Sequence, residues 1–99
     1  MKLFYMVLTL VIFGFGSLFA QDMNLKELSK YNGKNGQKAY IAVDGKIYDV
    51  SNNDEWKNGE HIPTQGKLKA GIDGTQVIEK SPHGKKVLAE LPVVGNLIK

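Results

Sequence analysis

Two histidines, His61 and His83, carry the most versatile side-chain chemistry in this chain. Pro63 lies two residues after His61, and Gly84 directly follows His83, so each ring can be held out from a loop at the rim of a cleft. A neutral imidazole binds transition metals, and two imidazoles on opposite walls can fill both axial positions of a haem iron. Loop histidines are usually just solvated, so the spacing alone favours two solvated side chains over a pair of haem ligands.

Other catalytic constellations are missing from the sequence. The chain has no cysteine, and its serines lie outside any nucleophile-elbow motif. The glycine segment at 33–36 is too short, and too rich in Lys and Asn, for a phosphate-binding loop. The acidic pair Asp54-Glu55 fits a helix start, and the carboxylates that could complete a zinc site show no HExxH-type spacing. The sequence therefore predicts a protein that is not an enzyme.

The elements that must position the histidines include one clear β-hairpin. Residues 39–43 and 46–50 are rich in β-branched and aromatic residues, and Asp44-Gly45 between them is the signature of a type I′ turn. Side chains alternate between the two faces of a strand. We therefore expect Tyr48 and Val50 to face the core.

Short helices are expected before and after the hairpin. Asn24 can cap a helix at its start, with Glu27 in capping-box register. Helical character returns from residue 70 to residue 80, although two glycines weaken it. Pro82 breaks that helix and places His83 near the start of another, over 84–90, with Val87 and Leu88 pointing inward.

Two further segments complete the expected domain. The only tryptophan, Trp56, follows a capping run at 52–54 in a single turn and is predicted to pack in the core beneath the His61 loop. Residues 91–97 are predicted to form a closing apolar strand or an extended tail.

The N-terminal segment predicts export. A short positive start is followed by an uncharged apolar run from Leu3 to Phe19, and polarity begins abruptly after Ala20. This is the pattern of a secretory signal peptide over 1–20, with an uncleaved N-terminal anchor as the alternative. The protein is then periplasmic or extracellular, and it reaches the membrane only if residues 1–20 remain as a tether.

Residues 21–99 form one domain at most. A core of this size is marginal, and without cysteines it has no disulfide support, which mildly suggests a cofactor. The formal net charge is +3, and the lysines are scattered rather than massed in a stripe with aromatic residues. That distribution argues against nucleic acid as a partner.

The chain from about residue 24 to residue 97 resembles the cytochrome b5-like haem/steroid-binding domain family, in its short exported bacterial form. The matching pieces occur in order: NLKELSKYNG, AYIAVDGKIYDVS, DEWKNGEH, AGIDGTQVI, SPHG and LPVVGNL. The resemblance implies an α+β domain, in which a short mixed sheet with a β-hairpin supports two helix pairs that form a haem cleft. It also implies that His61 and His83 are the two axial ligands of one haem b iron. Asp73 and Thr75 fall at a helix start, where we interpret them as caps.

The same resemblance implies an apolar wall around the haem and a role in electron transfer with a redox protein that the sequence does not identify. The expected wall residues are the apolar ones near the two ligands: Tyr48, Ile62, Leu68, Ile72, Val77, Ile78, Val87 and Leu88. Two imidazoles leave the iron no open position, which favours electron transfer over oxygen chemistry.

The chain departs from the family pattern at the first ligand. The commoner His-Pro-Gly-Gly is replaced by His61-Ile62-Pro63-Thr64, with the next glycine at position 66. A related branch, the membrane-associated progesterone-receptor-like proteins, uses a tyrosine for haem in this loop, but no tyrosine follows Tyr48 here. A binding module of the same fold, for haem or a hydrophobic small molecule without electron transfer, and a purely structural domain remain as alternatives.

Overall fold

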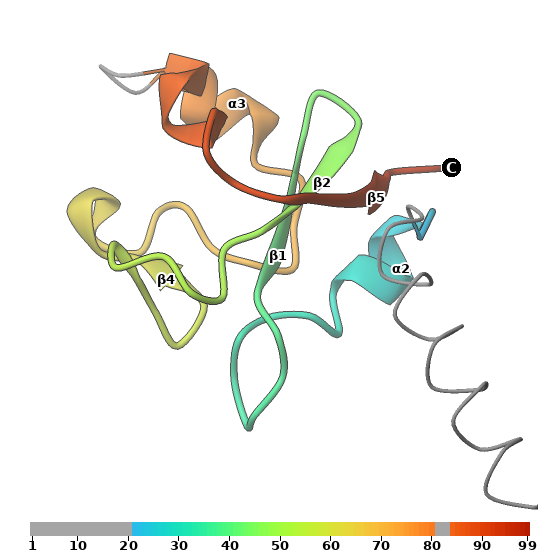
Figure 1. Ribbon diagram of the computed structural model, residues 1–99, viewed down its shortest axis with the longest axis horizontal. Helices are drawn as coiled ribbons and strands as arrows, with labels where there is room; N and C mark the ends of the chain where they lie inside the picture. The colour runs from blue at the N-terminus through green and yellow to red at the C-terminus, as the bar shows by residue number, and fades with distance from the viewer. Residues whose placement is uncertain (1–20, 81–83) are drawn as a thin grey trace, which may run out of the picture.

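A three-stranded sheet lies at the centre of the computed structural model, which describes residues 21–80 and 84–99 (Figure 1). The elements are, in order, α2 (Leu25–Leu28), β1 (Tyr40–Val43), β2 (Lys46–Asp49), β3 (Trp56–Lys57), β4 (Glu60–His61), η1 (Ile62–Thr64), α3 (Thr75–Glu79), η2 (Gly84–Leu88) and β5 (Val93–Asn96). The expected signal segment 1–20 and the second histidine, His83, lie outside the described residues.

The strands pair in the order β1-β2-β5, with both pairings antiparallel. Two isolated parallel bridges, Met23 with Leu97 and Ala42 with Asp73, extend this sheet and make it mixed. A separate two-stranded ribbon joins β3 to β4. The expected α+β class with a short mixed sheet is confirmed.

The hairpin turn has the predicted geometry. Asp44 and Gly45 have φ angles of 51° and 81°. A type I′ turn requires positive φ at both central residues, which Asp and Gly tolerate better than other residues. The turn fixes the register in which Ile41 faces Tyr48 and Ala42 faces Ile47.

Both faces of the sheet are buried. The first cluster lies on one face and contains Ala39, Ile41, Val43, Val50, Leu68, Ala70, Ile78 and Leu88. The second cluster lies on the other face and contains Met23, Leu28, Ala42 and Ile47. As predicted, Val50 is buried and Tyr48 packs against the first cluster. Alternation along β2 predicts that Ile47 points away from the core. Ile47 is nevertheless fully buried, because α2 and Met23 cover that face of the sheet.

Residues 21–23 approach β5 so closely that a glycine is required at position 95. Gln21 N–H donates to the Val94 carbonyl at 2.8 Å, and Met23 N–H donates to the Asn96 carbonyl at 3.0 Å. A Cβ placed on Gly95 would lie 1.8 Å from the Gln21 carbonyl oxygen. Gly95, in the VVG sequence at 93–95, therefore allows the backbone of Gln21 to pass directly over the last strand.

The first expected helix is confirmed together with its cap. The Asn24 side chain accepts from Glu27 N–H at 2.8 Å, and the Glu27 carboxylate accepts from Asn24 N–H at 3.0 Å. Leu28 is fully buried on this helix, whereas Leu25 is 55% exposed.

The helix expected over 70–80 is shorter than predicted, because α3 begins only at Thr75. Gly71 has a φ of 89°, outside the helical region. The following backbone runs along β1, where Ala42 N–H donates to the Ile72 carbonyl and Gly74 N–H donates to the Ala42 carbonyl. The sheet edge offers these residues hydrogen bonds that local propensity does not anticipate. The single turn expected around Trp56 is present, since Trp56 N–H donates to the Asn53 carbonyl at 3.0 Å and the Asn53 side chain accepts from Glu55 N–H at 2.9 Å. Trp56 itself then begins β3, which pairs with β4.

Helices flank the sheet unequally. The α3–η2 lobe contains one helix pair, packed together beside the hairpin on the face of the first cluster (Figure 1). α2 covers the other face, and η1 lies on the first-cluster side, attached to the β3–β4 ribbon. Its chain reverses at Gly59 and at Gln65, whose φ angles are 80° and 57°, and these reversals prevent a longer helix. No helix within the described residues is long and apolar enough to cross a membrane.

Replacing Ile47 by alanine tests whether the second face is part of the core. Because Ile47 is fully buried, we expect Ile47→Ala to lower the free energy of unfolding by about 2–5 kcal/mol in a urea titration. The matched control is Ile62→Ala, the same chemical change at a side chain that is 54% exposed, and it should cost much less. Equal losses for the two variants would contradict the assignment of Ile47 to a core cluster.

Candidate functional site

A cleft of about 590 Å³ lies between the β2–β3 connection and the segment from η2 to β5. Asn52, Asn53 and Glu55 line it from the connection between β2 and β3. Asp49, Lys86, Val87, Ala89, Glu90, Leu91 and Pro92 complete the lining. The volume falls within the range of small-molecule and cofactor sites, about 300–1,000 Å³. The lining mixes apolar and charged side chains, which suits an amphipathic ligand.

His61 stands where a strand becomes a helical turn. It ends β4 and precedes η1, and its N–H donates to the Leu68 carbonyl at 3.0 Å. Its carbonyl accepts from the Thr64 hydroxyl at 2.9 Å and from Gly66 N–H at 3.3 Å. The backbone of this residue is therefore bonded on both sides, so the ring projects from a fixed point.

The His61 ring has a polar neighbour at each nitrogen. Nδ1 lies 3.3 Å from the Thr64 hydroxyl, and Nε2 lies 3.6 Å from a carboxylate oxygen of Glu55. The His61 side chain is only 12% exposed, whereas that of Glu55 is 59% exposed. Glu55 also lines the cleft, so the Nε2 edge of the ring faces a residue of the cleft wall.

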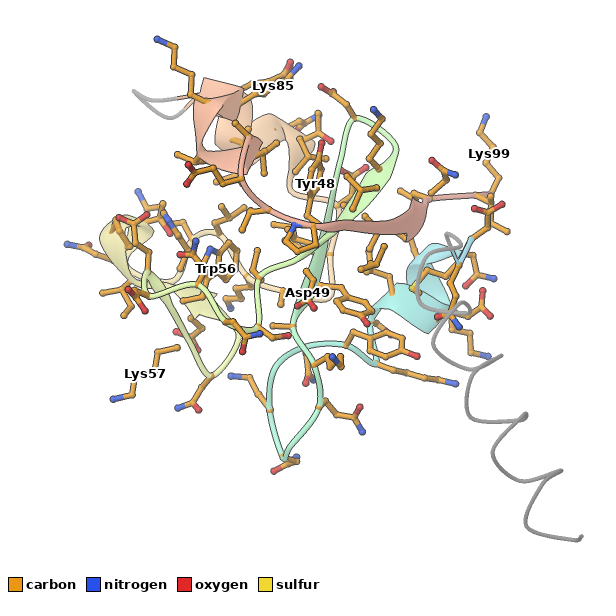
Figure 2. All side chains as sticks on the ribbon, in the orientation of Figure 1. Tyr48, Asp49, Trp56, Lys57, Lys85 and Lys99 are labelled. Atoms are coloured by element: carbon orange, nitrogen blue, oxygen red, sulfur yellow. The ribbon has the colours of Figure 1, made fainter. Side chains whose placement is uncertain are left out.

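Trp56 packs against the imidazole, as the sequence predicted. The two ring centroids are 5.1 Å apart and the planes are tilted by 53°, because Trp56 and His61 are register partners in the β3–β4 ribbon. Figure 2 shows Trp56 on the inner side of this ribbon and Lys57 pointing away from it. Trp56 also packs against the first cluster, so it connects the histidine to the core.

The expected wall residues fall into three environments. Leu68, Ile78 and Leu88 are buried in the first cluster, and Tyr48 and Val77 pack against it. Ile62 lines a smaller hollow of about 340 Å³ together with His61. Ile72 and Val87 are each 39% exposed, and Val87 lines the main cleft rather than pointing inward as expected. His83 lies outside the described residues, but its described neighbours Lys80 and Gly84 belong to the α3–η2 lobe.

The N-cap of α3 is Gly74, so the expected pair of caps is only partly present: Asp73 accepts from the first helical N–H, whereas Thr75 is the first helical residue and not a cap. The Asp73 carboxylate accepts from Thr75 N–H at 3.1 Å and from the Thr75 hydroxyl at 2.6 Å. The same hydroxyl accepts from Asp44 N–H at 2.9 Å. The start of α3 is thereby bonded to the hairpin turn.

A second contact joins the hairpin turn to η2. The Lys85 ammonium forms an ion pair with the Asp44 carboxylate, and this hydrogen bond raises the pKa of Lys85 above its ordinary value. Figure 2 shows Lys85 on the η2 side of the molecule, with Tyr48 beneath it on the sheet. α3, which precedes His83 in the chain, and η2, which follows it, are thus both attached to the hairpin turn.

Sequence reasoning missed two classes of site residue. The cleft lining comes from segments 49–55 and 86–92, which are distant in sequence, so no local pattern could have assembled it. Thr64 and Glu55, the polar neighbours of the His61 ring, were also missed. For Thr64 a signal existed, because a hydroxyl three residues after a histidine in a Pro-containing turn can return to it.

The described residues fit one side of a haem site. His61 could supply an imidazole, a donor that haem iron accepts, and its Nε2 edge faces Glu55 of the cleft wall. Partly exposed apolar side chains lie on both sides of the molecule, Ile62 on η1 and Val87 on η2.

Comparisons with known proteins agree with this geometry. Residues 24–98 match the family described as cytochrome b5-like heme/steroid binding domain. A cytochrome b5 domain protein of Methanococcoides burtonii superposes with a TM-score of 0.73 at 45% identity, over 79% of this chain and 97% of that one. A Hadesarchaea cytochrome b5 domain protein gives 0.72 at 42% identity, over 79% and 99%.

A more distant structure shares the fold only. It is a hypothetical protein of Arabidopsis thaliana with a cytochrome b5 like fold, at a TM-score of 0.60 and 21% identity, over 81% of this chain and 93% of that one. No curated protein matches the chain.

A sheet that carries two unequal lobes, with a cleft between them and an imidazole held on one side, defines a small α+β ligand-binding domain. This chain belongs to the cytochrome b5-like haem/steroid-binding domain family.

Replacing Asp73 by alanine tests the two side-chain hydrogen bonds that Asp73 forms with Thr75 at the start of α3. Loss of its two hydrogen bonds should lower the free energy of unfolding by about 0.5–2 kcal/mol, the usual cost of removing a helix cap. Urea unfolding followed by circular dichroism measures the change. Gln76→Ala, at an exposed position of the same helix, is the control and should leave stability nearly unchanged. A loss no greater than that of the control would contradict the capping role.

Proposed function

We propose that this chain is an exported b-type cytochrome domain that binds one haem b through His61 and His83 and transfers electrons. The observation that carries the proposal is the His61 imidazole, which is nearly buried, packed on Trp56 and fixed by backbone bonds at the edge of a cleft. Membership of the cytochrome b5-like family supports haem as the ligand.

The proposed chemistry assigns different tasks to cofactor and protein. Haem iron supplies one-electron redox chemistry when it is bound, and the protein supplies ligands, orientation and a partly dry cleft. Two imidazole ligands leave no open coordination position, which favours electron transfer and a lower potential than a His/Met pair. No group in the proposal acts on a substrate, so the protein is not an enzyme in this account.

The proposed location is outside the cytoplasm. The apolar run in residues 1–20 supports export to the periplasm or beyond, with tethering to the membrane if that segment is retained. The proposed partner is another redox protein, and neither nucleic acid nor a small-molecule substrate enters the account.

The visible spectrum of the haem-loaded protein tests the ligands. We expect sharp reduced α and β bands and little carbon monoxide binding, because both axial positions are filled. His61→Ala should open one position, so the reduced variant should bind carbon monoxide and lose the sharp bands. Haem affinity can be followed by quenching of Trp56, the only tryptophan, whose ring lies 5.1 Å from that of His61.

Two comparisons make the spectral experiment decisive. Ile62→Ala, beside the ligand, is the matched control and should keep the six-coordinate spectrum of the wild-type protein. His83→Ala should behave like His61→Ala. If no Soret band develops during haem titration of the folded wild-type protein, the proposed function is wrong.

One observation favours a second candidate function, a module that binds a hydrophobic or amphipathic molecule without electron transfer. The main cleft is lined by both sides of the molecule but not directly by His61, which lines the smaller neighbouring hollow. A His61→Ala variant with unchanged ligand affinity and unchanged spectrum would favour this alternative.

Intact mass spectrometry of the protein recovered from its producing cells tests the proposed export. Cleavage after Ala20 predicts a chain that begins at Gln21 and is found in the periplasmic or extracellular fraction. A full-length chain in the membrane fraction would indicate tethering instead. A full-length chain in the cytoplasm would contradict export in both forms.

A further inference from the structure

The Thr64 hydroxyl holds three polar partners at once. Its oxygen lies 2.9 Å from the His61 carbonyl, 3.2 Å from Leu68 N–H and 3.3 Å from Nδ1 of the His61 ring. A hydroxyl has one proton to donate and two lone pairs that accept. Three partners therefore use its whole hydrogen-bonding capacity, and the roles can be assigned by elimination.

Two of the three roles are fixed by chemistry. The Leu68 N–H can only donate, so it uses one lone pair of the hydroxyl. The His61 carbonyl can only accept, and two oxygens 2.9 Å apart need a proton between them, so the hydroxyl proton points to that carbonyl. One lone pair is left for the ring, and the ring must then donate. Nδ1 of His61 consequently carries the hydrogen, and the lone pair of a neutral ring lies on Nε2.

We propose that Thr64 is a positioning residue that fixes the tautomer and direction of the His61 imidazole, so that Nε2 is the nitrogen presented to iron. This inference rests on the proposed function. A histidine that binds a metal usually donates its other ring N–H to an oxygen acceptor, which sets the ring orientation and strengthens the ligand. Thr64 provides that acceptor from within the same turn.

The local backbone explains why Thr64 can reach the ring. Thr64 is the last residue of the 3₁₀ turn that directly follows His61, and this tight turn brings its hydroxyl back to the His61 carbonyl and ring. Pro63 restricts the turn, and Gln65, with a φ of 57°, ends it. Thr is branched at Cβ, so its hydroxyl has few alternative rotamers. The departure from His-Pro-Gly-Gly thus introduces a side-chain acceptor where glycine has none.

Nothing on the Nε2 side is held as firmly. Glu55 is the polar neighbour there, at 3.6 Å, which is too long for a strong hydrogen bond. Its side chain is 59% exposed and can leave without breaking a core contact. The ring is therefore fixed through Nδ1, whereas its described polar contact at Nε2 is with an exposed side chain that a ligand could displace.

The experiment compares Thr64→Val with Thr64→Ser in the haem-loaded full chain. Valine keeps the shape and removes the hydroxyl, so haem affinity should fall by about 10–100-fold, and the reduction potential should rise as the ligand weakens. Serine keeps the hydroxyl and should remain close to the wild-type protein in both measurements. Unchanged affinity and potential in a haem-binding Thr64→Val variant would overturn the proposal.

A second measurement does not depend on haem or on the folding of the valine variant. Long-range ¹H–¹⁵N NMR of the ligand-free wild-type protein, at about pH 8 where an ordinary imidazole is neutral, reports which ring nitrogen carries hydrogen. We expect Nδ1–H for His61, and Nε2–H would overturn the assignment. Failure to bind haem would instead disprove the proposed function while the tautomer can still be read.

Discussion

The register of the β1–β2 hairpin is the constraint on which the rest of this domain depends. Side chains alternate along a strand, so a slip of one residue would exchange the two faces of the sheet. In the observed register Ile41 and Tyr48 face the first cluster, whereas Ala42 and Ile47 face the second. The domain has no cysteine for a disulfide, so its stability depends on burying apolar side chains on both faces.

The hairpin turn also determines where the lobe beside the cleft is attached. Asp44 contributes its backbone N–H to the Thr75 hydroxyl and its carboxylate to Lys85, and so contacts both α3 and η2. Further down the same strand, Ala42 exchanges backbone hydrogen bonds with Ile72 and Gly74. A single hairpin thus fixes both the core and one wall of the cleft. A displacement of the turn would therefore also move α3, the helix that precedes His83 in the chain.

The opposite wall is built on a different principle. It has little regular helix, and its rigidity comes from the β3–β4 ribbon, the Trp56 ring and the hydrogen bonds of Thr64. The sequence His61-Ile62-Pro63-Thr64 stands here in place of His-Pro-Gly-Gly. The resulting turn is restricted by Pro63 and bonded through the Thr64 side chain. The Thr64 hydroxyl contacts both the His61 carbonyl and the His61 ring.

Local sequence patterns determined the hairpin turn and the capping box at Asn24. Each of these depends on residues a few positions apart, and the ordered motifs were specific enough to indicate the family. Only the tertiary structure decided that Ile47 is buried, that residues 72–74 follow β1 instead of a helix, and which residues line the cleft. The physical reason is that burial and backbone pairing depend on segments far apart in the chain, which supply cover and hydrogen bonds that no local window contains.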